Sequence, residues 1–519
     1  MQPNIISTTG TVAARWGGGS RMLRYGGLIA WDCALRQGRM AGGRGAVGVG
    51  VSVLDPEIAI LVNDVYDTNL KILYNRSLSC APVSGGSRMS INSEQKQILP
   101  STENCWFILA NIHGFPHKNQ EEIKKRNRIT WNRFYSSTIS NADKLILSEY
   151  FNLNELTPFS DKEMETVRAL FMERAESLGL NLPDPKRRID FRSCHFDKLV
   201  DFSGYIFPSS SFSGSKFGEL AIFNSAAFVG KTYFRGSEFC EISQFLNCKH
   251  LKEVSFSGAK FCLDVSFKES RYNEDVNFSD CNFLGDADFS GVKVHGNYYF
   301  RNSKVFGDSN FASVIFSGGV SFTNAELKAP TSFKHCAFEK SPPKFAGAQL
   351  HEGTVWRDVI WPPPPLDAGQ AAAFTDAYER LKLEMDRLRK HDDELNFFAK
   401  ELECKKLLMS PLNGAAIVLY DYLCDYGRSY VKPIYWLCAL ILFGAIFISS
   451  LESGKEFWES LGISAANSLA SLGIRKDLLG DSVLEMQPLT RIISGVQTIV
   501  GILLIFLIGL GLRNRFRMR

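Results

Sequence analysis

The sequence predicts a mostly β protein, in which a β-solenoid is followed by an α-helical linker and two C-terminal transmembrane helices. Three observations predict this class. Phe recurs every five or six residues from Phe191 to Phe345, and four consecutive prolines, 362–365, end that repeat. Two late segments of 19 and 21 residues then contain no charge.

Length and composition set the outer limits. The chain has 519 residues, a formal net charge of +4 and 22% charged residues. This length suits several units, and the composition is that of an average globular protein. A nearly neutral balance gives no electrostatic basis for nucleic-acid binding, so no nucleic-acid partner is expected.

The N-terminal region, residues 1–104, is rich in Gly and Arg. Its first 50 residues hold 12 Gly and six Arg against a single acid, Asp32. An Arg-rich, acid-poor composition is typical of transit peptides, but the glycine runs would break an amphipathic helix. We therefore expect a poorly ordered tail, or a start codon assigned too early.

Residues 105–188 predict a small helical or mixed module. Ser160 and Glu163 form a capping box, in which each side chain bonds the backbone amide of the other residue. Apolar residues follow at helical spacing, and Gly179 is a natural stop.

Phe supplies the main repeat of the chain. Of 39 Phe residues, 25 lie between Phe191 and Phe345, at steps of five or six that often alternate. Neither a helix, with period 3.6, nor a strand, with period 2, has this spacing. Where Phe is missing on schedule, another apolar residue takes its place: Leu251, Tyr272, Val294, Leu327 and Leu350. Small residues often stand two positions before, among them Cys194, Cys281 and Cys336.

A five-residue step with one large and one small inward residue fits one face of a solenoid coil. Four faces need about 20 to 22 residues, so residues 189–361 predict roughly eight coils. Coils stacked at ~4.8 Å would pile Phe upon Phe in a rod ~38 Å long.

The segments FSGAKFCLDVSF and NFSDCNFLGDADF resemble the pentapeptide-repeat family, in its variant with alternating five- and six-residue steps. The resemblance covers about 170 residues and implies a right-handed quadrilateral β-helix. The sixth residues depart from the strict pattern, which bears on corner geometry and not on the solenoid itself. Some members mimic DNA and protect a topoisomerase, which needs dense acidic charge. Residues 190–358 hold 18 basic and 19 acidic side chains, so we expect a mixed polar surface instead.

No catalytic, cofactor-binding or metal-binding residues are predicted. The 12 Cys contain no CxxC pair, and we interpret them as reduced, small, semi-apolar residues. The histidines of the repeat fall at different phases of the Phe pattern, so they form no metal stripe: His195, His250, His295 and His335.

Residues 366–410 predict an amphipathic helical linker. A first helix has one apolar stripe, made of Phe374, Tyr378, Leu381, Met385 and Leu388. A break is expected at His391–Asp393, before a second helix that starts near Leu395 and ends near Lys406. The charged faces are solvated, or else they meet a coiled-coil partner.

The C-terminal part predicts a membrane hairpin. Residues 433–451 and 492–512 each match the ~20 residues that cross the hydrocarbon core of a bilayer. The neighbouring units are an interfacial segment at 412–432, an outer loop at 452–491 and a basic tail at 513–519. Basic residues flank both helices on one side, so the positive-inside rule places the solenoid in the cytosol.

The outer loop contains LGISAANSLASLGI, residues 461–474, which is too short to span a bilayer. A helix, a short re-entrant segment and a second helix is the layout of two-helix pore-loop cation channels. The C-terminal end also resembles the membrane hairpin attached to many bacterial pentapeptide-repeat proteins. A potassium filter of the TVGYG type is absent, and Arg475 and Lys476 would repel cations. Ser468, Ser471 and Gly473 are the candidate pore-loop residues.

These patterns predict a non-enzymatic protein of the bacterial inner membrane, multi-pass, with the bulk of the chain in the cytosol. Its expected partners are the lipid bilayer and a protein that binds the solenoid as a scaffold, with homo-oligomerisation as an option. The alternative is a subunit of a pore-loop ion channel, with the solenoid as its cytosolic domain. Topoisomerase protection by the repeat is a third hypothesis.

Overall fold

The computed structural model describes residues 5–8, 11–14, 99–116, 120–452, 455–473 and 486–517. The chain divides into two compact units, 1–92 and 93–519. In the first, β1 (Ile5–Thr8) pairs antiparallel with β2 (Thr11–Ala14). Most of the region predicted to be poorly ordered, 1–104, lies outside the described residues. Everything below concerns the second unit.

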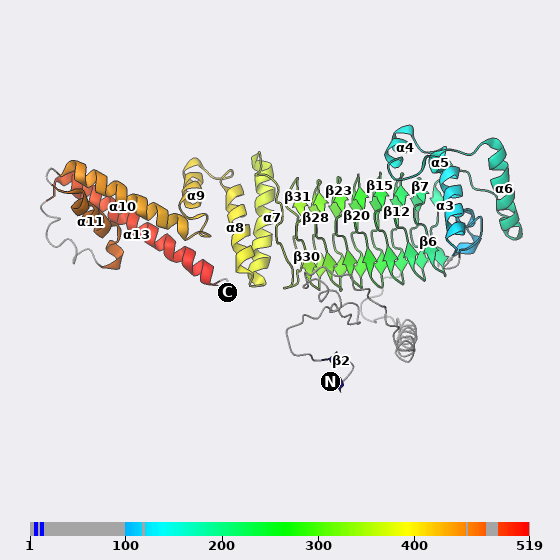
Figure 1. Ribbon diagram of the computed structural model, residues 1–519, viewed down its shortest axis with the longest axis horizontal. Helices are drawn as coiled ribbons and strands as arrows, with labels where there is room; N and C mark the ends of the chain where they lie inside the picture. Colours follow the sequence, from blue (N-terminus) through cyan, green and yellow to red (C-terminus); the bar gives the residue numbers. More distant parts are fainter. Residues whose placement is uncertain are drawn as a thin grey trace, which may run out of the picture. The chain divides into compact units, whose positions relative to one another are not determined.

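The centre of this unit is a solenoid of two-residue and three-residue strands in four parallel sheets (Figure 1). Each sheet takes one strand from every coil, and partners lie one coil apart, as Val265 and Ala287 do. The four sheets make seven full turns. Isolated bridges at Lys344, Gln349, Val355 and Ile360 continue the ladder for one further round. The predicted four-sided β-solenoid is thus confirmed.

The strands of the four sheets have these bounds. The first sheet contains β4 (Ile189–Asp190), β8 (Ser210–Ser211), β12 (Thr232–Tyr233), β16 (Val254–Ser255), β20 (Val276–Asn277), β24 (Tyr298–Tyr299) and β28 (Val320–Ser321). The second contains β3 (Leu99–Pro100), β5 (Cys194–Phe196), β9 (Lys216–Phe217), β13 (Glu238–Phe239), β17 (Lys260–Phe261), β21 (Asn282–Phe283), β25 (Lys304–Val305) and β29 (Glu326–Leu327). The third contains β6 (Val200–Asp201), β10 (Ala221–Ile222), β14 (Ser243–Gln244), β18 (Val265–Ser266), β22 (Ala287–Asp288), β26 (Ser309–Asn310) and β30 (Thr331–Ser332). The fourth contains β7 (Ile206–Phe207), β11 (Ala227–Phe228), β15 (Lys249–His250), β19 (Arg271–Tyr272), β23 (Lys293–Val294), β27 (Ile315–Phe316) and β31 (Ala337–Phe338).

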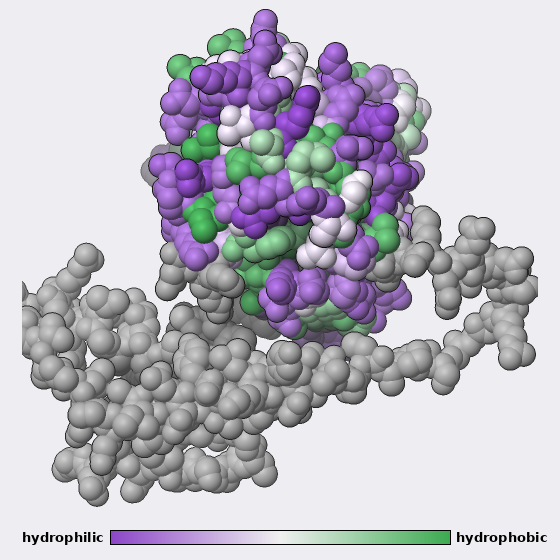
Figure 2. Space-filling view, turned by 90° about the vertical axis from the view of Figure 1, so that its right-hand side faces the viewer, coloured by the Kyte–Doolittle hydropathy of each residue, from purple (hydrophilic) through white to green (hydrophobic). Residues whose placement is uncertain are grey.

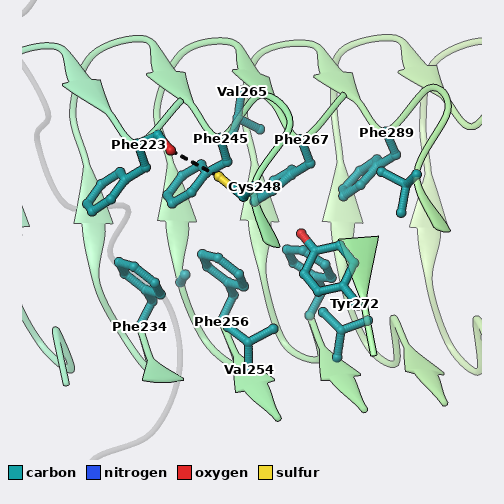
Figure 3. Packing of buried hydrophobic residues seen from close by; sticks show 14 of the residues in the cluster. Phe223, Phe234, Phe245, Cys248, Val254, Phe256, Val265, Phe267, Tyr272 and Phe289 are labelled. Atoms are coloured by element: carbon teal, nitrogen blue, oxygen red, sulfur yellow. Dashed lines mark hydrogen bonds between the residues drawn. The ribbon is translucent and has the colours of Figure 1, made fainter. Parts of the chain in front are cut away.

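Phe residues of successive coils stack on one another inside the solenoid (Figure 3). The rings of Phe217 and Phe239, for example, lie 4.7 Å apart between centroids and are nearly parallel. Of the 25 Phe residues in the predicted repeat, 24 are buried. The exception is Phe306, which is 44% exposed because Val305 takes the inward place in its coil. The prediction was wrong at that position.

A second prediction was wrong at residue 251. The fourth sheet pairs Phe228 with His250, so the imidazole enters the aromatic column where Leu251 was expected. His250 is 1% exposed and stacks between Phe228 and Tyr272, at 4.5 and 4.6 Å between ring centroids. Leu251 instead joins a small apolar cluster with Leu147 and Leu156 of the helical module.

Corners of the solenoid are regular, although five- and six-residue steps alternate. The residue two positions after every second inward aromatic has a positive φ, whether it is Gly258 or a residue such as Asn247 or Asp280. The next residue is small and points inward. Several of these side chains donate to a Phe carbonyl in the preceding coil; the Sγ of Cys248 lies 3.0 Å from the oxygen of Phe223 (Figure 3). Cys281 and Cys336 make the same bond, so their predicted role as interior fillers is confirmed.

A helical module precedes the solenoid and covers its first edge. The helices are α2 (Cys105–Ala110), α3 (Glu121–Ser136), α4 (Asn141–Leu147), α5 (Leu153–Leu156) and α6 (Asp161–Ala175), with the 3₁₀ turns η2 (Ser101–Glu103) and η3 (Glu176–Leu178). The capping box of Ser160 and Glu163 is present, and Gly179 ends η3 with φ 60°. From α3, Trp131 donates its indole N–H to the carbonyl oxygen of Ile206 at 2.8 Å. The outer face of the module is mostly polar, with scattered apolar side chains (Figure 2).

Two helices cover the other end, α7 (Ala368–Arg387) and α8 (His391–Lys405). The predicted apolar stripe is buried on α7, and Phe397 of α8 packs edge-on against Trp356 and Trp361 of the last coil. The expected break at His391–Asp393 was placed too late, because His391 already begins α8. Acidic residues in a first helical turn are favoured by the helix dipole, so Asp392 and Asp393 start the helix rather than interrupt it.

The C-terminal part is helical. Its elements are α9 (Pro411–Cys424), α10 (Val431–Leu451), α11 (Phe457–Ser468), the 3₁₀ turn η4 (Ala470–Leu472) and α13 (Pro488–Arg517). Ring contacts join α9 to the start of α10, where Tyr422 and Trp436 lie 4.8 Å apart between centroids. The three helices α10, α11 and α13 pack on one another and form what we call the membrane unit.

Candidate functional site in the membrane unit

The outer surfaces of α10 and α13 are apolar and exposed. Only 11% of the apolar stretch of α10 and 28% of that of α13 is buried within the chain. A core helix of a soluble protein would be mostly covered, whereas Phe443, Ile499 and Phe506 are each more than half exposed. With 21 residues, α10 is about 31 Å long, which matches the ~30 Å hydrocarbon core of a bilayer. Both helices can therefore insert into a membrane.

Helix α11 lies between them and is held by polar bonds. The side-chain amide of Gln497, on α13, donates to the hydroxyl oxygens of Ser464 (2.5 Å) and Ser468 (2.9 Å) on α11. Ser464 in turn donates to the carbonyl oxygen of Ile441 on α10 at 2.6 Å. One short chain of hydrogen bonds thus ties all three helices. We call the buried polar residues along it, with Ser460, Asn467 and Ser494, the polar seam.

Several atoms of the polar seam have no hydrogen-bond partner among the described residues. Asn467 is 1% exposed, yet neither its amide nitrogen nor its amide oxygen is bonded. The hydroxyls of Ser460 and Ser494 and the amide oxygen of Gln497 are in the same state. A polar group without a partner is costly in an apolar environment, so these side chains favour water, an ion or a neighbouring chain as a partner.

Glycines let the three helices approach closely. A Cβ added to Gly444 of α10 would lie 2.4 Å from the Nε2 atom of Gln497, and one on Gly501 of α13 would lie 2.3 Å from the carbonyl oxygen of Ser468. Gly509, by contrast, faces open space. The sequence indicates that small residues permit packing here, and the structure shows which of them do so.

Comparison with known proteins identifies the solenoid. The family model described as pentapeptide repeats (9 copies) matches residues 256–304 and 278–326, which lie in the middle of the four-sheet ladder. The solenoid is a pentapeptide-repeat domain. Neither the comparison with curated proteins nor that with solved structures found a match.

The pentapeptide-repeat domain carries an ordered column on the outside of its second sheet. The residue that follows each inward Phe, Val or Leu lies directly above its counterpart in the next coil, 22 residues later. This outer column consists of Gly218, Cys240, Cys262, Leu284, Phe306 and Lys328. Leu284 and Phe306 are 43% and 44% exposed, and Leu263 and Ile242 are equally exposed beside them. Together they make an apolar strip on an otherwise mixed polar surface.

The three candidate pore-loop residues lie at different depths. Ser468 ends α11 and is buried in the polar seam. Ser471, in η4, is exposed, and so is Gly473, whose φ of +80° ends that turn. The structure thus brings Ser468 to the seam and leaves the other two at the surface of the single chain. Arg475 and Lys476 lie outside the described residues.

Sequence reasoning missed Gln497, Ser464 and Asn467. A signal for them was present, because Gln497 is one of few polar residues in a 21-residue uncharged segment. A polar side chain in such a segment commonly marks a packing or transport function. Within the part of the chain that the structure describes, no group of three or more His, Cys, Asp or Glu could hold a metal ion.

Proposed function

We propose that this chain is a membrane-anchored pentapeptide-repeat protein whose solenoid acts as a non-enzymatic scaffold for another protein. The observation that carries the proposal is the combination of two exposed apolar helices with a rigid, capped solenoid that has one apolar strip. The helices fix the chain to the bilayer, and the solenoid offers a preformed surface. A preformed surface loses little conformational entropy on binding.

The apolar strip around Leu284 and Phe306 is where we place the protein partner. Neighbouring members of the same outer column are charged or small, so the strip is bordered by polar groups. The ammonium of Lys328 lies 4.6 Å above the ring of Phe306, and Lys304 pairs with Glu326 at 2.8 Å. An apolar centre with a polar rim is typical of protein interfaces.

We further propose that the solenoid lies on the cytosolic side of a bacterial inner membrane. Basic side chains gather where α10 begins and α13 ends, and the two ends are joined because Asn514 donates to the carbonyl oxygen of Gly427 at 3.0 Å. Arg428 and Lys432 stand at the first of these ends, and Arg513, Arg515 and Arg517 at the second. The positive-inside rule assigns such an end to the cytosol.

The scaffold proposal is tested by purifying the full chain from membranes with its bound proteins. The test variant is Leu284→Ser with Phe306→Ser. The matched control is Leu145→Ser with Leu153→Ser, which replaces two apolar residues that are 75% and 73% exposed on the helical module. We expect one protein to accompany the wild type and the control in a fixed ratio, and to fall about tenfold or more with the test variant. Equal recovery with all three chains would contradict the proposal.

A second candidate function is a subunit of a pore-loop channel, and the placement of α11 between α10 and α13 favours it. In that case Ser468, Ser471 and Gly473 would line the pore of an oligomer, and the unpartnered atoms of Asn467 would face water or a neighbouring chain. Planar-bilayer recording and the mass of the detergent-solubilised particle test this candidate. Unitary currents from an oligomer, altered by Ser471→Ala and Gly473→Ala but not by Gly462→Ala, would support it. A monomer without currents would leave the anchor alone.

A further inference from the structure

Cys240 and Cys262 are neighbours on the outside of the pentapeptide-repeat domain. Glu238 pairs with Lys260 and Phe239 with Phe261, so the next residues, Cys240 and Cys262, also lie side by side on adjacent coils. The amide of Cys262 donates to the carbonyl oxygen of Phe239 at 2.8 Å, which fixes this register. Coils of a β-solenoid are ~4.8 Å apart, which is within the Cα separation that a disulfide spans.

These two cysteines differ from those of the core. Cys248, Cys281 and Cys336 are buried and donate to Phe carbonyls, so a reagent cannot reach them. Cys240 and Cys262 are half-buried and belong to the outer column. The filler role that explains the core cysteines therefore does not explain this pair.

The surroundings of the pair favour a thiolate on Cys240. Its pKa is lowered to about 7, first because the thiol of Cys262 donates a hydrogen bond to its sulfur, and then because Lys216 and Lys260 are close. Burial and the carboxylate of Glu238 oppose the shift. Glu238 is held by both lysines, at 3.4 Å from Lys216 and 3.0 Å from Lys260. The pKa of Cys262 is raised because its proton is shared with Cys240.

We propose that Cys240 and Cys262 form a modification site, a surface dithiol that small-molecule disulfides oxidise to an internal disulfide across two coils. The Cys240 thiolate attacks one sulfur of the reagent RSSR, forms a mixed disulfide and releases RS⁻. Cys262 loses its proton to that RS⁻ and attacks the Cys240 sulfur, which forms the internal S–S bond and expels the second RS⁻. With the proton first held by Cys240 taken up by this second thiolate, the sum is two protein thiols and RSSR giving one disulfide and two RSH. Excess RSH reverses the step.

The experiment exposes the full-length detergent-solubilised chain to oxidised glutathione at pH 7 and maps the products by mass spectrometry. The wild type is expected to lose two hydrogen atoms in a link between Cys240 and Cys262, without a lasting glutathione adduct. Cys262→Ser is expected to keep the adduct on Cys240, because the second attack is removed. Cys240→Ser is expected to leave residue 262 unmodified.

A second readout measures the thiolate itself through the pH dependence of iodoacetamide alkylation at Cys240. The midpoint is expected near 7 in the wild type and about one unit or more higher in Cys262→Ala, so that alkylation at pH 7 slows about tenfold. Cys336, in the core of the same chain, serves as the internal reference and stays unlabelled until the protein unfolds. A lasting glutathione adduct on wild-type Cys240, or equal alkylation midpoints in the two chains, would overturn the proposal.

Discussion

His250 sits in the aromatic column at a cost, and replacing it with Phe is expected to stabilise the fold. Neither ring nitrogen has a hydrogen-bond partner among the described residues. A buried, unbonded polar group costs about 1–3 kcal/mol. His250→Phe keeps the stack with Phe228 and Tyr272 and removes those nitrogens, so we expect it to raise the free energy of unfolding by about that amount at pH 7.

The same substitution is expected to change how stability depends on pH. Burial lowers the pKa of His250 from its usual 6.5 to about 3. Between these values the unfolded chain takes up the proton and the folded chain does not, so the stability that this residue allows is complete above pH 6.5 and is lost as the pH falls. Linkage gives a loss of about 2 kcal/mol between pH 7 and pH 5. His250→Phe should abolish this part of the acid sensitivity.

Urea unfolding of the full chain in detergent, followed by far-UV circular dichroism, measures both effects. The matched control is His295→Phe, because His295 is exposed in the same domain and should leave the pH dependence unchanged. The reasoning is refuted if the gain from His250→Phe is the same at pH 7 and at pH 5. It is refuted equally if the substitution destabilises the domain at both values.

Three further predictions concern packing. Phe267→Ala opens a cavity between stacked coils and should lower the free energy of unfolding by about 3–5 kcal/mol, whereas Phe306→Ala should change it by less than about 0.5 kcal/mol, as the same urea titration would show. Gly501→Leu should push α11 away from α13 and cost about 1–3 kcal/mol or more in thermal unfolding of the detergent-solubilised chain, while Gly509→Ala should be neutral; equal melting temperatures would contradict this account of the packing. Gln497→Leu should loosen α11 and increase its amide hydrogen exchange, since the bonds to Ser464 and Ser468 are lost; unchanged exchange would show that those bonds do not hold the helix.

The sequence was sufficient to predict the solenoid because its inward positions repeat. Nearly every Phe in the series serves the same packing role, so the spacing alone indicated four faces and about eight coils. The two errors, at Phe306 and Leu251, arose where two adjacent residues were both able to fill the inward place. There the choice depends on the register with the neighbouring coil, which a single coil's sequence does not contain.

The membrane unit was less predictable for a different physical reason. Hydropathy shows that α10 and α13 can cross a bilayer, but it does not show which polar side chains meet inside. Gln497, Ser464 and Asn467 come together from two helices that are separated by a long connection. Such a meeting depends on helix packing, and the close approach at Gly444 and Gly501 decides it. The candidate pore-loop residues Ser468, Ser471 and Gly473 remain a prediction.

The strict register of the coils also bears on how this rod can change over evolutionary time. In the middle of the ladder one coil takes 22 residues, and every column continues unbroken from coil to coil. A duplication or deletion of 22 residues would alter the rod's length by one ~4.8 Å step while every column kept its side. An insertion of 11 residues would instead carry everything downstream to the opposite side, with its partners out of line. Whole-coil changes are therefore the only tolerated currency of growth, so the rod is a spacer whose length can drift in steps while its faces keep their directions.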